Sequence, residues 1–220
     1  LREGIPSLMT FGETVGDVRV TDIVLDDAGR PSFLLRHGRD SHRVELSVSG
    51  RHQALNAAAA AAAAAAIGVD LGDFASRLGR TGGSDWRMDV HQGEITVVND
   101  AYNANPQSVE AALRTVAAMP ATKRIAVLGT MSELGSVCER EHRRMGEVAA
   151  EVGFDSVIVV GPDHGYVLGA PDLVSNATGL QDAANTLHAI SEPGAVVLVK
   201  ASRSAGLERL ALDLIQDTRA

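Results

Sequence analysis

The second half of the sequence alternates between short unbroken apolar runs and segments whose apolar residues follow helical spacing. The apolar runs predict strands at residues 94–99, 124–129, 156–160 and 195–199. The helical patterns predict helices at 106–119, 139–152, 180–190 and about 204–217, with a weaker helix–strand segment through 163–175. A hairpin of 85–91 with 94–99 is expected around Gln92-Gly93. The alternation predicts an α/β fold with a Rossmann-like, mostly parallel sheet, right-handed crossovers and helices on both faces.

The first part of the chain has different patterning. Segments rich in β-formers at 18–26, 32–37 and 42–49 are separated by turn-forming residues, which predicts an antiparallel meander. A helix is predicted at 52–67, through a run of ten alanines that stops before Gly68, and a second helix at about 70–78. We interpret this part as a partial domain of antiparallel strands and two helices, whose sheet continues outside the given sequence.

Composition narrows the class of protein. The 220 residues carry a formal net charge of −8, and no basic stripe is present, so a nucleic-acid partner is not expected. The sequence has no run of 18 strongly apolar residues, so a membrane-spanning helix is not expected. The single Cys138 favours a reducing, cytoplasmic location. The chain starts at Leu1 without an initiator methionine or a signal peptide, from which we expect a piece of a longer protein.

Polar residues gather where the predicted strands end, and ligands bind beyond the carboxyl ends of parallel strands. Asp100, Tyr102, Asn103 and Asn105 follow the strand at 94–99 and offer donors and acceptors for a hydroxylated or amide-bearing ligand. The alternative is a turn in which Asn105 only caps the next helix, which would leave Tyr102 and Asn103 unexplained.

The last predicted strand ends in Lys200, Ser202 and Arg203, directly before a helix. Two cations, a hydroxyl and a helix N-terminus suit a carboxylate or phosphate. The alternative is a basic sheet edge that is merely solvated. The glycine-bracketed segment 129–135 is either an ordinary turn or a ligand loop, and His142 and His164 are expected to be solvated.

Three patterns do not occur in the sequence. It contains no G-x-x-x-x-G-K-[ST] loop for a nucleoside triphosphate and no G-x-G-x-x-G after a strand, which disfavours a dinucleotide oxidoreductase. No Cys/His set has zinc spacing, so no metal ligand is assigned, and no catalytic residue is assigned either.

Several motifs follow one another along nearly the whole chain: Gly50-Arg51-His52-Gln53-Ala54-Leu55-Asn56-Ala57, Gly79-Arg80, Asp100-Ala101-Tyr102-Asn103-Ala104-Asn105-Pro106, Val127-Leu128-Gly129 with Glu133-Leu134-Gly135, and Lys200-Ala201-Ser202-Arg203-Ser204. Taken together and in this order, they resemble the Mur ligase family. The resemblance implies that residues 1–79 are the end of a central ATP-binding domain and that 80–220 are the C-terminal domain. Within the family, it points to the ligases that add D-alanyl-D-alanine to UDP-N-acetylmuramoyl-tripeptide in peptidoglycan synthesis.

The resemblance also implies roles for individual residues. The nucleoside of ATP would be contacted by Asn56, Arg80, Asp100 and Asn103. The D-alanyl-D-alanine acceptor would be contacted by Tyr102, Asn105, Lys200, Ser202 and Arg203. Gln53 and Thr130 depart from the family's usual Asn and Asp.

The reaction implied is activation of the tripeptide carboxylate by ATP, followed by attack of the acceptor amine. The phosphate loop and the Mg²⁺ ligands would belong to N-terminal domains outside this sequence, so the chain alone is expected to be inactive. The alternative is a non-catalytic module that binds a nucleoside or a peptide.

Overall fold

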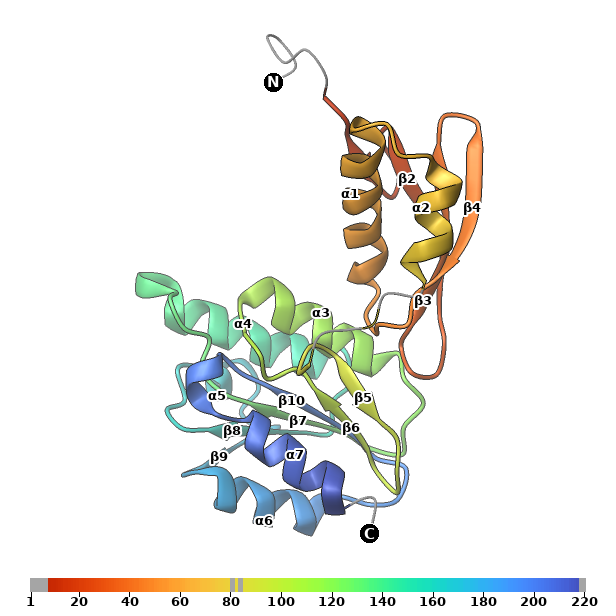
Figure 1. Ribbon diagram of the computed structural model, residues 1–220. Coiled ribbons are helices and arrows are strands. Elements are labelled where there is room, and N and C mark those ends of the chain that lie inside the picture. Colours follow the sequence, from red (N-terminus) through yellow and green to blue (C-terminus); the bar gives the residue numbers. More distant parts are fainter. Residues whose placement is uncertain (1–7, 80–81, 83–84, 218–220) are drawn as a thin grey trace. The chain divides into compact units, whose positions relative to one another are not determined.

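The computed structural model describes residues 8–79, 82 and 85–217. The chain divides into two compact units, Leu1–Gly83 and Ser84–Ala220, which are described one at a time. Figure 1 shows the elements of each unit.

The first unit contains a sheet of strand order β1-β2-β3-β4. Its strands are β1 (Phe11–Gly12), β2 (Val18–Leu25), β3 (Pro31–His37) and β4 (Asp40–Glu45). Strands β2, β3 and β4 form the predicted antiparallel meander. Strand β1 pairs parallel to β2, so the sheet is mixed rather than purely antiparallel. Two residues are too short for a periodic pattern, which is why the sequence did not predict β1.

Two helices pack on this sheet, as predicted. In α1 (His52–Ala66), the buried residues are alanines at helical spacing, which lets the helix approach β2 closely. Gly68 has φ +85° and its N–H binds the carbonyl of Ala65, so glycine ends the helix. Helix α2 (Leu71–Leu78) starts at Asp70, whose carboxylate accepts the Asp73 N–H at 3.0 Å.

The second unit is built on a sheet of strand order β5-β6-β10-β7-β8-β9. Its strands are β5 (Asp89–His91), β6 (Thr96–Asn99), β7 (Arg124–Leu128), β8 (Ser156–Val160), β9 (Val174–Ala177) and β10 (Val196–Lys200). Strands β5 and β6 form the predicted antiparallel hairpin, and all other pairs are parallel. The predicted mostly parallel α/β sheet is therefore confirmed.

Helices cover both faces of this sheet, as the apolar runs predicted (Figure 1). The elements are α3 (Pro106–Ala117), α4 (Cys138–Glu151), α5 (Tyr166–Gly169), α6 (Leu180–Ile190) and α7 (Glu208–Asp217). Neighbouring residues of one strand enter opposite cores: Val98 packs with the α3 and α4 side, whereas Val97 packs with the α6 and α7 side. The last helix begins four residues later than predicted, because a 3₁₀ turn (Arg203–Ala205) and Gly206 at φ +67° precede it.

Strand order decides which loops meet. Strand β10, the last in sequence, inserts between β6 and β7, so the loops that follow these three parallel strands lie at one edge. The helices that follow β6 and β7 lie on one face and the helix that follows β10 lies on the other. Such a divergence is the usual ligand position in open α/β sheets.

Candidate functional site

A buried ion pair lies where β6 and β10 end. The Lys200 ammonium is 2.5 Å from Asp100 Oδ2 and donates a second bond, of 2.9 Å, to the Asn103 carbonyl. Asp100 Oδ1 accepts the Met88 N–H at 3.0 Å. Burial lowers the pKa of Lys200, while the Asp100 charge opposes that shift. The pair therefore joins three segments: the hairpin before β6, the loop after β6 and the end of β10.

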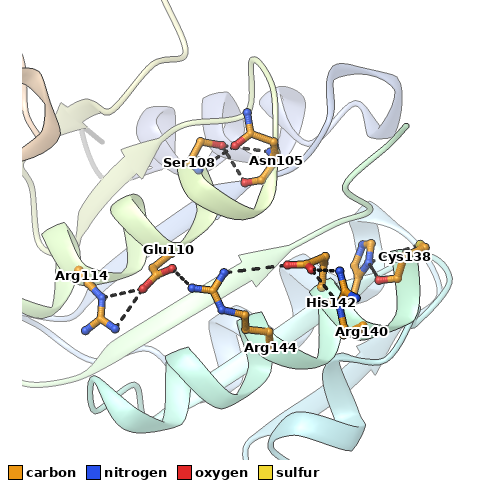
Figure 2. A network of polar contacts seen from close by, with 9 residues as sticks. Asn105, Ser108, Glu110, Arg114, Cys138, Arg140, His142 and Arg144 are labelled. Carbon is orange, nitrogen blue, oxygen red and sulfur yellow. Dashed lines mark hydrogen bonds and ion pairs between the residues drawn. The ribbon is translucent and has the colours of Figure 1, made fainter. Parts of the chain in front are cut away.

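The loop after β6 contains the other polar residues that the sequence singled out. The Asn105 carboxamide oxygen accepts the Ser108 N–H at 2.9 Å, and Ser108 Oγ accepts the Asn105 N–H (Figure 2). Asn105 therefore caps α3. The exposed Asn103 accepts the Ala104 N–H with its side-chain oxygen, and Tyr102 is half-buried.

Ser202 connects the loops after β7 and β10. Its hydroxyl accepts the Ser132 N–H at 2.8 Å, and its own N–H donates to the Thr130 carbonyl at 3.0 Å. Ser202 is buried, whereas Ser132 is exposed. The segment 129–135 is thus fastened to the segment that carries Lys200 and Arg203.

Two guanidinium groups and two aromatic rings lie together at this edge. The Arg87 guanidinium carbon is 4.0 Å from the centre of the Tyr102 ring, and that of Arg203 is 5.4 Å from the same ring and 5.6 Å from that of Trp86. Both arginines are exposed, and within the described residues no carboxylate pairs with either. Exposed cations of this kind suit an anionic ligand.

Sequence reasoning did not single out Trp86 or Arg87. The predicted hairpin could have indicated them. Asp89 pairs with Asn99, which brings the residues just before β5 beside those just after β6. Any polar residue at 86–88 was therefore a candidate neighbour of Asp100 and Tyr102.

The expectation that His142 is solvated was wrong. The imidazole is completely buried, with Nε2 accepting the Met131 N–H at 2.9 Å and Nδ1 lying 2.7 Å from the Cys138 carbonyl. Its position on α4 explains the burial, because Met145 and Ala149 follow at helical spacing on the same face and are also buried. His164 is half-buried, and its ring lies 5.1 Å from that of His142.

A pocket of about 390 Å³ opens beside this edge, between the loops that follow β7, β8, β9 and β10. Its rim carries hydroxyl groups rather than charges, from Thr130, Ser132, Thr178 and Ser204. It can therefore hold a small polar ligand, and one of its lining residues, Ser204, directly follows Arg203 in the chain.

The remaining predicted contacts belong elsewhere. Asn56 is exposed on α1 in the first unit, where its amide donates to Gln53 at 3.0 Å. Arg80 lies outside the described residues.

The described residues include a candidate contact for the ribose of ATP but no group of ligands for Mg²⁺. Asp100 is bound on both carboxylate oxygens, yet each oxygen has a second lone pair that can accept a ribose hydroxyl. Across residues 8–79, 82 and 85–217, no group of three or more His, Cys, Asp and Glu side chains is arranged to hold a metal ion. We therefore assign no Mg²⁺ ligand among the described residues. Over the same ranges, no helix has the length and apolarity to cross a bilayer.

Comparison with known proteins identifies the family. Residues 86–203 match the Mur ligase, glutamate ligase domain. The UDP-N-acetylmuramoyl-tripeptide–D-alanyl-D-alanine ligase of Mycobacterium tuberculosis is 38% identical over 234 aligned residues, which cover 93% of this chain and 46% of the relative. The corresponding ligase of Bacillus subtilis is 32% identical over 78% of this chain and 39% of its own length.

Solved structures give the same result. A crystal structure of MurF from Acinetobacter baumannii superposes with a TM-score of 0.85 at 31% identity, over 94% of this chain and 46% of that one. The MurF ligase of Thermotoga maritima in complex with ADP has a TM-score of 0.81 at 26% identity, over 96% and 49%. The chain spans about half the length of the curated relatives it matches. It belongs to the Mur ligase family and corresponds to the C-terminal part of these ligases.

Proposed function

We propose that this chain is the C-terminal part of an ATP-dependent ligase that adds D-alanyl-D-alanine to UDP-N-acetylmuramoyl-tripeptide, in the cytoplasm. The observation that carries the proposal is the gathering of polar groups at the end of β6, β7 and β10, in a chain 38% identical to a ligase of that name. In this proposal the chain supplies nucleoside and acceptor contacts, and the remaining half of the enzyme supplies the phosphate loop and Mg²⁺ ligands.

The acceptor is proposed to bind at the exposed arginines. The Arg203 guanidinium suits the carboxylate of D-alanyl-D-alanine, and Arg87 adds a second cation above Tyr102. Two of the three Lys200 N–H donors bind Asp100 and the Asn103 carbonyl, and the Ser202 hydroxyl binds Ser132. We propose that both residues act mainly by holding the loops in place. Asn105 caps α3 with its side-chain oxygen, and it contacts the ligand through its side-chain NH₂ group.

The nucleoside contacts proposed for this chain are Asn56, Arg80, Asp100 and Asn103. ATP, when bound, supplies the phosphoryl group that activates the tripeptide carboxylate. This chain orients the acceptor amine toward that carboxylate, and orientation alone can contribute several kcal/mol, up to about 7–11 kcal/mol in well-aligned cases.

Calorimetry with D-alanyl-D-alanine tests acceptor binding by the isolated chain, with L-alanyl-L-alanine as the stereochemical control. A ligation assay with UDP-N-acetylmuramoyl-tripeptide and ATP tests the rest of the proposal. We expect no turnover from this chain alone, and turnover once the N-terminal half of the M. tuberculosis relative is added. Turnover without that half would overturn the division of labour proposed here.

The second candidate is a non-catalytic module that binds a nucleoside or a peptide. It is favoured by one observation, the lack of a G-x-x-x-x-G-K-[ST] loop in the 220 residues. Binding of D-alanyl-D-alanine or adenosine without any gain of turnover on adding the N-terminal half would support this candidate.

A further inference from the structure

The loop that follows β7 is held at its start by two side chains that the proposed reaction does not use. His142, on α4, accepts the Met131 N–H at 2.9 Å. Tyr166, at the start of α5, donates its hydroxyl to the Gly129 carbonyl at 2.9 Å. The two rings also touch edge to face, with centres 4.9 Å apart. Both side chains are buried, so neither contact competes with water.

These contacts lie directly before Ser132, whose N–H donates to Ser202. Ser202 is two residues from Lys200 and adjacent to Arg203, so the position of the loop after β7 and that of the basic segment after β10 depend on each other. The same loop lines the 390 Å³ pocket through Thr130 and Ser132. A displacement at Met131 would therefore reach Ser132 and, through its bond to Ser202, the neighbouring Arg203.

We propose that His142 and Tyr166 are positioning residues, which hold the loop after β7 so that Ser132 docks on Ser202 and the acceptor-binding edge keeps its shape. Loop holding follows from the contacts alone, whereas the consequence for the acceptor rests on the proposed function. Neither side chain touches the pocket or the arginines, so their effect is exerted through the loop.

The chemistry of the imidazole makes this role specific to one protonation state. Nε2 accepts an N–H, so it carries no proton, and Nδ1–H donates to the Cys138 carbonyl. The titratable groups that face the ring are Cys138 from α4, Asp163 and His164 from the segment before α5, and Tyr166 from α5 itself. A proton on Nε2 would point at the Met131 N–H and release the loop.

Three variants of this chain separate loop positioning from packing. His142→Gln places an amide oxygen near the Nε2 position, where it can accept the Met131 N–H. His142→Leu keeps an apolar core residue and removes the acceptor. Tyr166→Phe removes the bond to Gly129 and keeps the ring. His188→Leu, an exposed histidine on α6, is the matched control.

The readouts are the NMR amide signals of Met131 and Ser132 in the ¹⁵N-labelled chain, and the affinity for D-alanyl-D-alanine. We expect His142→Leu and Tyr166→Phe to shift both signals and to weaken binding about tenfold or more, since displacements of about 1 Å can cost that much. His142→Gln should restore both readouts, and His188→Leu should leave them unchanged.

The outcomes decide between the claims. Unchanged Ser132 signals in folded His142→Leu and Tyr166→Phe would overturn the positioning role. If His142→Leu does not fold, His142→Gln decides: a folded His142→Gln chain whose Ser132 signal differs from that of wild type would overturn the positioning role. Shifted signals in the two variants, together with a wild-type chain that binds no D-alanyl-D-alanine, would support loop holding and overturn the proposed function.

Discussion

The Lys200 ammonium and the Asp100 carboxylate, 100 residues apart in sequence, meet at 2.5 Å in the interior of the second unit. Only 2% of the Lys200 side chain and 11% of the Asp100 side chain are exposed. The contact joins the ends of β6 and β10, which are neighbours in the sheet. The pair therefore fixes the two loops between which the proposed acceptor site lies.

Removal of both partners of this pair should cost clearly less stability than the two single removals added together. Lys200→Met leaves Asp100 as a buried, unpaired charge, and we expect a loss of about 3–5 kcal/mol in the free energy of unfolding of the second unit. Asp100→Asn combined with Lys200→Met should cost clearly less than the sum of the single changes. Urea denaturation of the four chains measures the coupling, and strictly additive costs would contradict it.

Asn105 has one demonstrated contact, as the cap of α3, and one proposed contact, with the acceptor. Asn105→Ala should lower stability by about 1 kcal/mol. Asn105→Asp keeps an oxygen for the Ser108 N–H but loses the amide donors, so stability should hold while D-alanyl-D-alanine affinity falls. Thermal unfolding and calorimetry on the same samples separate the roles. If Asn105→Asp binds D-alanyl-D-alanine like wild type, the role of Asn105 is limited to capping α3.

Arg203 and Arg87 should matter for binding but little for stability. Both are exposed, and a cation over an aromatic ring at an exposed site contributes only about 0.5–1 kcal/mol. Arg203→Ala should weaken D-alanyl-D-alanine binding about tenfold or more, because a charge-assisted bond contributes about 1.5–3 kcal/mol. Arg203→Lys should retain only part of the wild-type affinity for D-alanyl-D-alanine, since Lys cannot bind a carboxylate in a bidentate manner.

A matched control is available on α4. Arg140 is also exposed, and it pairs with Glu141 in the ionic network that links α3 and α4 through Glu110, Arg114 and Arg144 (Figure 2). Arg140→Ala should change neither binding nor stability appreciably. Equal losses of affinity in Arg140→Ala and Arg203→Ala would indicate a general charge effect rather than a site.

The sequence predicted most elements because their signals are local. Strands such as β8 are short apolar runs, and α1 is an alanine run that a glycine ends. Strand order is not local: the insertion of β10 between β6 and β7 is what brings Lys200 to Asp100, and no pattern in either segment encodes it. The family resemblance assigned Asp100 to the nucleoside and Lys200 to the acceptor, and it did not give their contact.

The buried histidine was missed for a different reason. Histidine is usually placed by its polarity, yet His142 lies on the apolar face of α4 and has both ring nitrogens satisfied by backbone groups. The Met131 N–H belongs to a loop, and its position could not be predicted before the sheet was assembled. Trp86 and Arg87 were missed although the hairpin was predicted, because its register was not used.

Stability of the second unit should fall in mild acid because of His142. Burial lowers the pKa of this imidazole from its ordinary value of 6.5, and the His164 charge adds to the effect, while the Cys138 carbonyl and Asp163 oppose it. The unfolded chain therefore takes up a proton that the folded chain resists. The contribution of neutral His142 to the free energy of unfolding is fully present above about pH 6.5. It is lost as the pH falls toward the folded-state pKa, at up to about 1.4 kcal/mol per pH unit.

The variant that isolates this contribution is His142→Gln, which cannot titrate. Denaturation of wild type and variant at about pH 7.5 and about pH 5 gives two pH dependences, and other titrating groups cancel in their difference. We expect wild type to lose more stability than the variant. Equal losses would mean that His142 titrates alike in the folded and unfolded chains.

Gly146 on α4 should resist replacement although alanine is the better helix former. A Cβ at this position would lie 2.4 Å from the Tyr166 carbonyl oxygen and 3.3 Å from the Gly169 Cα, because α5 packs directly on α4. Alanine gains about 1 kcal/mol in helix propensity, whereas overpacking costs about 1–3 kcal/mol. The obstacle is backbone, which no change of rotamer relieves, so overpacking should dominate.

We therefore expect Gly146→Ala to lower the unfolding free energy of the second unit, by up to about 2 kcal/mol. Because α5 begins with Tyr166, its displacement should also loosen the bond to Gly129 and shift the Ser132 amide signal. Glu147→Ala, one residue along on the exposed side of α4, should lose only its ion pair with Arg143, about 0.3–0.5 kcal/mol, and leave that signal in place. A more stable Gly146→Ala chain with an unmoved Ser132 signal would show that α4 and α5 can separate without disturbing the loop after β7.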